Sequence, residues 1–184
     1  MAYSPQDHSL AMPLAHHTIV RSARIEDIDS IVAFSAAMAL ETEGRQLDHG
    51  RLREGTRSLL AASERGFFMV AESTREGAPQ LIGQLMITFE WSDWRNGSFW
   101  WIQSVYVLPT WRGQGVFRLM HSTVVERAKA DPGVCGVRLY VESANRVAQD
   151  VYRRVGLKPS SYAVFETDFV LGHRQRLQDQ PDEA

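Results

Sequence analysis

Apolar residues recur along this chain with two periods, one typical of helices and the other of strands. Between residues 28 and 39 they are spaced three or four apart, which predicts an amphipathic helix that ends near Gly44. The same spacing predicts further helices around 52–60, 116–129 and 145–154. Short apolar or alternating runs predict strands at 18–21, 66–72, 80–89, 98–108, 136–141 and 162–169.

Turn signals connect three of these strands in a row, between residues 66 and 108. Gly77 and Pro79 mark the first turn, and Asn96-Gly97, a strong tight-turn signal, marks the second. We therefore expect three consecutive antiparallel strands, the last of which leads into helix 116–129.

The composition is that of a soluble globular protein, with 44% hydrophobic and 23% charged residues. A formal charge of −2 provides no basic field for a nucleic-acid backbone. The single cysteine, Cys135, allows no intramolecular disulfide and is expected to be an incidental thiol in a reducing compartment. No signal peptide and no apolar run of ~18 residues is found. We expect a cytoplasmic protein without a membrane partner, formed by one domain at 18–171 between loose tails at 1–17 and 172–184.

The segment 105–117 carries the strongest chemical signal. A strand that stops at Pro109 is followed by a turn with Gly113 and Gly115, and a helix opens directly after it. The first N–H groups of a helix have no partner within it and attract anions. Either this turn binds a phosphate, or its glycines only shape a tight connection. It is neither a Walker loop nor a GxGxxG turn, because no Gly-Lys-Ser/Thr follows and residue 118 is arginine.

A second group of residues lies on helix 145–154. Asn145, Ala148 and Tyr152 are spaced to fall on one face, and Asn145 stands where a polar side chain caps a helix. Taken alone, they are better explained as a cap, a small packing residue and a half-buried tyrosine. On helix 116–129, His121 lies on the polar side of the apolar stripe and is expected at the surface.

Together the two segments resemble a known family. Arg112-Gly113-Gln114-Gly115-Val116-Phe117 resembles the Arg/Gln-x-x-Gly-x-Gly/Ala signature of the Gcn5-related N-acetyltransferase (GNAT) superfamily, and Asn-x-x-Ala-x-x-x-Tyr-x-x-x-Gly-Leu resembles its second signature. Phe117 departs from the pattern, which has Gly or Ala there, so its ring either presses on the turn or faces the core. The resemblance implies an α+β (mixed α/β) GNAT-like fold, in which a central, mostly antiparallel twisted sheet of six to seven strands is flanked by about four helices.

The resemblance also implies acetyl-coenzyme A as cosubstrate, without a metal. The amides of the turn would hold its pyrophosphate, and Tyr152 would lie near its sulfur as a catalytic residue. If the strand before the turn splays away from strand 136–141 as in the family, its backbone N–H groups become free to stabilise an oxyanion. The residues expected at the cofactor are Val105, Tyr106, Val107, Arg112, Gly113, Gln114, Gly115, Val116, Phe117, Asn145 and Tyr152.

The expected activity is direct transfer of the acetyl group to an amine, that is, N-acetylation. Carboxylates would attract the ammonium or take its proton, and tryptophan rings could hold its alkyl part. Glu41 is the first choice for contacting the amine and Glu90 the second, and both are expected as catalytic residues. The base can be Glu41, Glu43, Glu90 or Asp93, and the sequence does not choose among them. The residues expected to contact the acceptor are Glu41, Glu43, Trp91, Asp93 and Trp94.

Alternatives remain open on the acceptor side. Each acid can also be a solvated surface charge, and the tryptophans can form a packed hairpin base or the contact of a homodimer. The alternative function is a catalytically silent acyl-coenzyme A-binding or regulatory module of the same fold. An intact Tyr152 and several nearby acids favour the enzyme.

Overall fold

The structure is a computed structural model that describes residues 17–75 and 77–171. The tails expected at 1–17 and 172–184 fall, except for residue 17, outside these residues. Short 3-10 turns precede the first helix, join the third strand to the fourth, and follow the fourth. In chain order the strands and helices are β1 (Thr18–Ser22), α1 (Ile28–Glu43), α2 (His49–Leu60), β2 (Gly66–Ser73), β3 (Gln80–Ser92), β4 (Gly97–Val107), α3 (Val116–Ala130), β5 (Val134–Arg138) and α4 (Arg146–Arg154).

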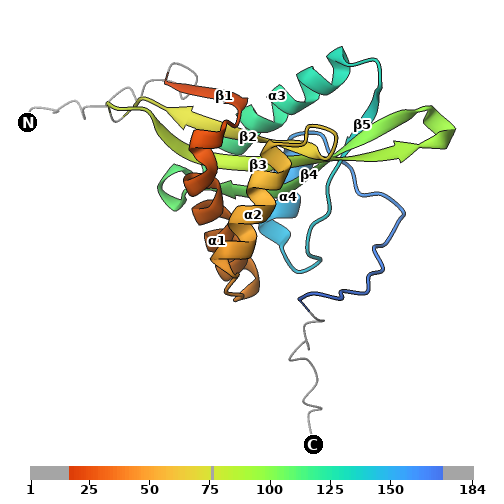
Figure 1. Ribbon diagram of the computed structural model, residues 1–184. Helices are drawn as coiled ribbons and strands as arrows, with labels where there is room; N and C mark the ends of the chain where they lie inside the picture. The colour runs from red at the N-terminus through yellow and green to blue at the C-terminus, as the bar shows by residue number, and fades with distance from the viewer. Residues whose placement is uncertain (1–16, 76, 172–184) are drawn as a thin grey trace, which may run out of the picture.

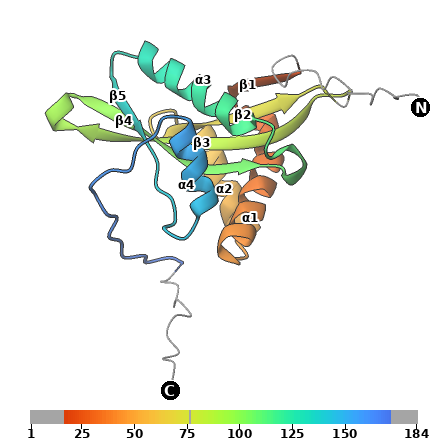
Figure 2. The same cartoon turned by 180° about the vertical axis from the view of Figure 1, so that it is seen from behind.

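The strands of the described residues form one sheet in the order β1-β2-β3-β4-β5. Neighbouring strands are antiparallel except β4 and β5, which run parallel. In Figure 1, α1 and α2 lie in front of the sheet, and the reverse view in Figure 2 shows α3 and α4 on its other face. The expected α+β fold, with a mostly antiparallel sheet and four helices, is confirmed.

Apolar side chains fill the space between the sheet and the helices on both faces. Met69 of β2 and Leu85 of β3 belong to one buried cluster with Met120 of α3. Ile31 of α1 packs with Val70 of β2 in a second cluster. All five side chains are fully buried, and such burial stabilises by roughly 1.5–3 kcal/mol for each. This core holds β3 and β4 rigidly, and the candidate site is built on the end of β4.

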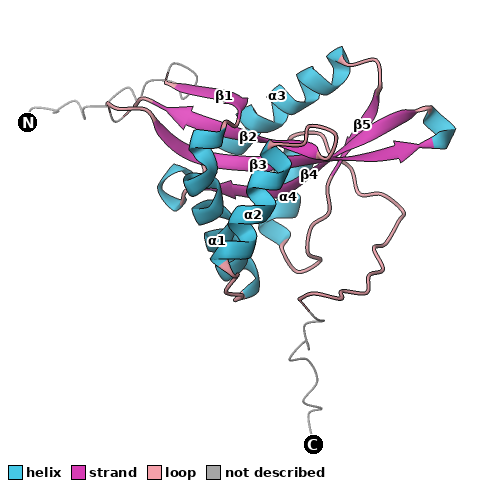
Figure 3. Cartoon of the chain, in the orientation of Figure 1, coloured by secondary structure: helices cyan, strands magenta, loops and turns pink. Residues whose placement is uncertain are grey.

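Three detailed expectations about the sheet are wrong. The described residues form five strands instead of six to seven, and residues 162–169 form none. Figure 3 shows this segment within a long loop after α4. Its alternating side chains could form a strand only beside a pairing neighbour, and here they are exposed, Phe165 by 95%. The strand expected at 136–141 also ends early, at Arg138, because its pairing with β4 stops there.

Candidate functional site

The connection between β4 and α3 has the geometry of an anion site. After the 3-10 turn Pro109–Trp111, Gly113 and Gly115 have φ angles of 75° and 90°, in the left-handed region that glycine tolerates. Gly115 is the N-cap of α3 and brings no capping side chain. The first amide N–H groups of α3 therefore have no side-chain acceptor and remain open to an anion.

Side chains brace this turn. Gln114 donates through Nε2 to the Thr110 carbonyl oxygen at 2.8 Å, and its Oε1 accepts from Arg75 at 2.7 Å. The Arg75 guanidinium also lies over the ring of the buried Trp111, 5.5 Å from the centroid. Sequence patterns indicated neither Arg75 nor Trp111. Arg75 lies far along the chain from the turn that it contacts, so no local pattern could indicate it. Trp111 could have been identified, because it is a large aromatic residue directly before the signature.

Beyond their paired segment, β4 and β5 separate, as the resemblance implied. The pairing stops at Trp101↔Arg138, while β4 runs on to Val107. On the β5 side, the backbone groups around Val105 therefore have no strand partner. A register shift between β3 and β4 bends the strand further near Ser104, which has a φ of 49°. Free N–H groups at a strand end are the donors that a developing oxyanion requires.

The second signature lies on α4. Asn145 Oδ1 accepts a hydrogen bond from the Ala148 amide at 3.0 Å and so caps the helix, as its spacing predicted. The Tyr152 ring lies 5.4 Å from the ring of Phe117 on α3. Burial raises the pKa of the Tyr152 phenol above its usual value. The Phe117 ring is half-buried and lies against Tyr152 of α4, outside the two buried clusters.

His121 is buried, and the expectation of a surface position is wrong. His121 is only 6% exposed, and its ring lies 5.9 Å from that of Phe117. Among the described residues its Nε2 has no hydrogen-bond partner, and burial lowers its pKa. The aliphatic stripe of α3 did not indicate this, because Phe117 widens the buried side of the helix beyond the stripe.

Glu41, near the end of α1, contacts two residues expected at the cofactor. Its Oε1 accepts from the Tyr106 hydroxyl at 2.9 Å, and its Oε2 accepts from Arg112 Nη2 at 2.6 Å. Arg112 Nε also donates to the Val107 carbonyl oxygen at 2.9 Å. The hydrogen bond from Arg112 is the main reason why the pKa of Glu41 is lowered. A carboxylate held ionised in this way attracts an ammonium but is a weaker base.

The other expected acids are also engaged. Glu90 accepts from the indole Nε1 of Trp101 and from Arg138 Nη1, the latter at 3.1 Å. It thereby joins β3, β4 and β5 at the last paired position of β4 and β5. Glu43 forms an ion pair with Arg45 at 3.7 Å. An acceptor ammonium would have to share or displace these partners.

The tip of the β3–β4 hairpin carries the remaining expected contacts, Trp91, Asp93 and Trp94. Trp91 pairs with Ser98. From Ser98 to Tyr106, the partner of Glu41, β4 extends ~26 Å at about 3.3 Å per residue. Trp94 is 85% exposed. The structure therefore brings Glu41 together with the cofactor turn and holds the hairpin tip at the other end of β4.

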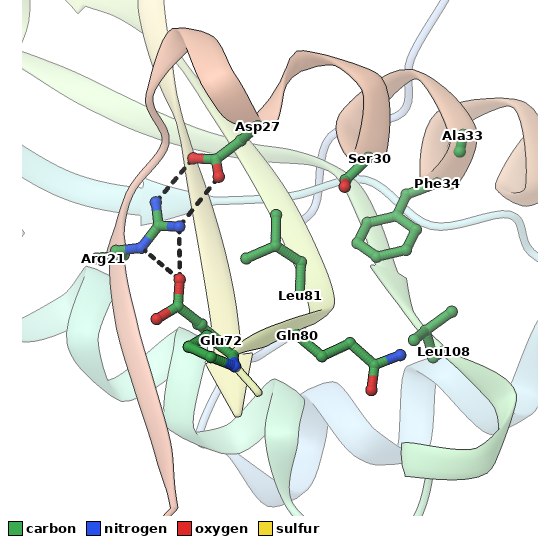
Figure 4. Close-up of a pocket in the computed structure, with 10 residues that line it drawn as sticks. Arg21, Asp27, Ser30, Ala33, Phe34, Glu72, Gln80, Leu81 and Leu108 are labelled. Carbon is green, nitrogen blue, oxygen red and sulfur yellow. Dashed lines mark hydrogen bonds and ion pairs between the residues drawn. The ribbon is translucent and has the colours of Figure 1, made fainter. Parts of the chain in front are cut away.

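A separate cavity of about 520 Å³ opens beside the start of α1 (Figure 4). Phe34 and Leu108 line it together with Arg21, which donates to Asp27 and to Glu72, each at 2.7 Å. The hydrogen bond between Arg21 and Asp27 raises the pKa of the guanidinium and lowers that of the carboxyl group. Because each of these charges has a partner, we assign the cavity no catalytic role. The ion pairs instead hold β1, β2 and the start of α1 together.

Within residues 17–75 and 77–171, no group of three or more His, Cys, Asp and Glu side chains is placed to hold a metal ion. No helix in these ranges is long and apolar enough to cross a membrane.

The fold and the site define a class of protein, an α+β domain in which a strand leads through a two-glycine turn with the geometry of an anion site into the N-terminus of a helix. The chain belongs to the acetyltransferase (GNAT) family, whose family model matches residues 33–157. Members of this family are acyltransferases that use acetyl-coenzyme A. Two observations fit that cosubstrate here, namely the open amides after Gly115 and the unpaired backbone of β4 beyond Trp101.

Individual proteins illustrate the similarity. A possible acetyltransferase from Clostridium difficile 630 is 35% identical, with 84% of this chain and 99% of that chain covered and a TM-score of 0.76. A predicted acetyltransferase from Clostridium acetobutylicum, solved with acetyl-CoA, is 21% identical, with 85% and 99% covered and a TM-score of 0.65. The thialysine N-epsilon-acetyltransferase of Bos taurus is 32% identical over 78 residues, or 42% of this chain. That alignment spans 45% of the bovine protein, so the match covers less than half of that relative's length.

Proposed function

We propose that this protein transfers the acetyl group of acetyl-coenzyme A to a primary amine and so forms an amide. The observation that carries the proposal is the end of β4, which loses its partner β5 after Trp101 and leads into a turn that opens the N-terminus of α3. One stretch of backbone thereby offers donors to a diphosphate and to a thioester carbonyl. The name of the bovine relative, a thialysine N-epsilon-acetyltransferase, supports an amine as acceptor.

The backbone has two tasks in this proposal. Acetyl-coenzyme A, when bound, supplies the thioester carbon that the amine attacks and the thiolate that leaves. The first amides of α3, from Val116 onward, hold the diphosphate, and the helix dipole adds to the attraction. The N–H groups of β4 near Val105 and Val107 donate to the oxyanion. A single donor of this kind is worth ~2.7–4 kcal/mol. Asn145, at the start of α4, is proposed to contact coenzyme A.

Tyr152 is proposed to donate a hydrogen bond to the sulfur as negative charge develops there. With usual pKa values of ~10 for tyrosine and ~8.5 for a thiol, complete proton transfer is uphill by about 2 kcal/mol. Burial raises the pKa of Tyr152, which makes complete transfer still less favourable. A hydrogen bond that strengthens with the charge on sulfur avoids this cost, which supports a donor role over that of a full acid.

Glu41 is the first choice for binding the acceptor ammonium, and Glu90 is the second. An alkyl ammonium with a pKa of ~10.4 is neutral in only about one molecule in ~2,500 at pH 7, so a group must take its proton. The lowered pKa of Glu41 supports a binding role over that of base. Glu43 adds charge to the same end of α1. The hairpin tip, with Trp91, Asp93 and Trp94, would serve only an acceptor long enough to reach it.

The decisive experiment measures thiol release from acetyl-coenzyme A with a panel of small primary amines. The parent is expected to turn over at least one of them. Tyr152→Phe should lower kcat by about 10²-fold while coenzyme A affinity stays nearly unchanged, because its interaction strengthens after the ground state. Tyr162→Phe is the matched control, since Tyr162 is exposed on the loop after α4 and should keep the parental kcat.

Two results would count against the proposal. Tight binding of coenzyme A without turnover on any amine would support the catalytically silent module instead. A kcat of Tyr152→Phe within twofold of the parent would make Tyr152 a packing residue, and the hydrogen bond to sulfur would have to come from another group.

A further inference from the structure

Phe117 makes the ring contact that joins α3 to α4. It stands where the family signature has Gly or Ala, at the second residue of α3. Its ring centroid lies 5.4 Å from that of Tyr152 on α4, with the planes inclined at 60°. It also lies 5.9 Å from the ring of His121, one turn further along α3. Such spacings are typical of favourable aromatic pairs, worth about 0.5–1.5 kcal/mol beyond burial.

The second helix of this pair depends on tertiary contacts. α4 has nine residues, and isolated helices of fewer than ~12–15 residues are marginal in water. None of its residues is buried, and Val147 is 79% exposed. The Asn145 cap satisfies one amide at the first turn, but it does not fix the helix on the sheet. Contact between Tyr152 and Phe117 therefore has a large share in holding α4 in place.

The backbone and the side chain of Phe117 serve different neighbours. Its amide N–H belongs to the open first turn of α3, where the proposed diphosphate binds. Its ring contacts Tyr152 of α4 and His121. Alanine at this position would keep the amide and remove the ring. The side chain of Tyr152 would then face a gap of the size of a phenyl ring.

We propose that Phe117 is a positioning residue, whose ring fixes α4 and thereby the hydroxyl of Tyr152 relative to the cofactor turn. This inference rests on the proposed role of Tyr152 in acetyl transfer. The inference explains why this chain has Phe117 where the signature has Gly or Ala, because a smaller side chain could not bridge α3 and α4. His121 contacts the same ring.

A double-mutant cycle on kcat tests the proposal, with Phe117→Ala and Tyr152→Phe made singly and together. Phe117→Ala should lower kcat at least tenfold and change the Kd of coenzyme A by less than about threefold. In the Tyr152→Phe background it should lower kcat no further, because the group that it positions is absent. Phe117→Tyr keeps the ring and should retain more than half of the parental kcat.

A second measurement does not depend on turnover. Amide hydrogen exchange, followed by mass spectrometry, should become faster across residues 146–154 in Phe117→Ala. Leu119→Ala is the matched control, because Leu119 is also half-buried but lies two residues on, and therefore on the other flank of α3. That variant should leave the exchange of α4 unchanged.

Several outcomes would overturn the inference. If the losses in kcat multiply in the double variant, Phe117 acts independently of Tyr152. If Phe117→Ala tightens coenzyme A binding at unchanged kcat, the ring crowds the turn instead. Unchanged exchange of α4 would also refute it, even for a protein without turnover. If only Tyr152→Phe keeps the parental kcat, the proposed chemistry of Tyr152 fails, and exchange still decides whether the ring holds α4.

Discussion

Replacement of Gly115 by valine tests the cofactor turn most directly. Gly115 has a φ of 90° at the N-cap of α3. A Cβ there would meet no atom closer than 3.5 Å, the nearest being Nη2 of Arg118. The damage is therefore conformational, because a β-branched residue avoids the left-handed region. Such strain costs about 1–3 kcal/mol, and it acts on the amides that point at the proposed diphosphate.

These costs translate into measurable shifts. In a domain of this size, 1 kcal/mol moves Tm by about 2–4 °C, so Gly115→Val should lower Tm by about 2–12 °C. A ligand that binds only the folded state adds about 2.7 kcal/mol at one hundred times its Kd, or about 5–11 °C for the parent with coenzyme A. The variant should lose about half of this second shift for a tenfold weaker Kd, because tenfold in Kd removes ~1.4 of the ~2.7 kcal/mol.

Gly44→Val provides the control. Gly44 ends α1 with a φ of 59°, and a Cβ there would meet nothing within 4 Å. It should show a comparable loss of Tm but keep the parental Kd for coenzyme A in a calorimetric titration. If Gly115→Val also binds coenzyme A with the parental Kd, the turn is not the phosphate cradle, whatever its effect on Tm.

Two further predictions concern the acids and the buried histidine. Glu41→Gln and Glu90→Gln should raise the KM of the amine if the acids only bind it. If one of them is the base, its variant should depress kcat and move the alkaline-rising limb of the pH profile. Unchanged kcat, KM and pH profile in both variants would place the acceptor site elsewhere. His121 has a lowered pKa when folded, so the unfolded chain binds its proton more tightly and stability should fall as pH drops below about 6.5. His121→Leu should flatten that fall and raise the free energy of unfolding by up to about 1–3 kcal/mol, because it removes a buried nitrogen without a partner among the described residues. Urea unfolding from pH 5 to 8 measures both effects. An equally steep fall in the variant would assign the pH dependence to another group.

Local signals predicted most of the elements, because each rests on residues close together in the chain. Gly44 ends α1 and Gly156 follows α4, both with positive φ, as expected of glycine at a helix end. Asn145 caps α4, as its place before the apolar spacing indicated. The two-glycine turn opens α3 as predicted, because a strand, a turn and a helix start are all encoded within thirteen residues at 105–117.

Features that depend on distant contacts were not predictable in the same way. The alternation at 162–169 indicates which side chains could share a face, but it cannot supply the strand that must pair with them. The polar character of His121 suggested solvent, whereas the rings of Phe117 and Tyr152 extend the apolar surroundings on that side of α3. The partners of Glu41 lie 65 and 71 positions away, so no local pattern could indicate that this acid is already paired.

That pairing decides how the acceptor side must be tested. Arg112 belongs to the cofactor signature, yet its guanidinium binds the Val107 carbonyl oxygen and Glu41. Both Arg112 and Glu41 are about half exposed, so the pair contributes little stability, and an arriving ammonium or phosphate can compete for either partner at low cost. A change at Glu41 therefore frees a guanidinium beside the proposed diphosphate site. An altered KM for the amine in Glu41→Gln identifies an acceptor contact only if the Kd of coenzyme A is unchanged, because a shift in both would mean that Arg112 has moved to the cofactor.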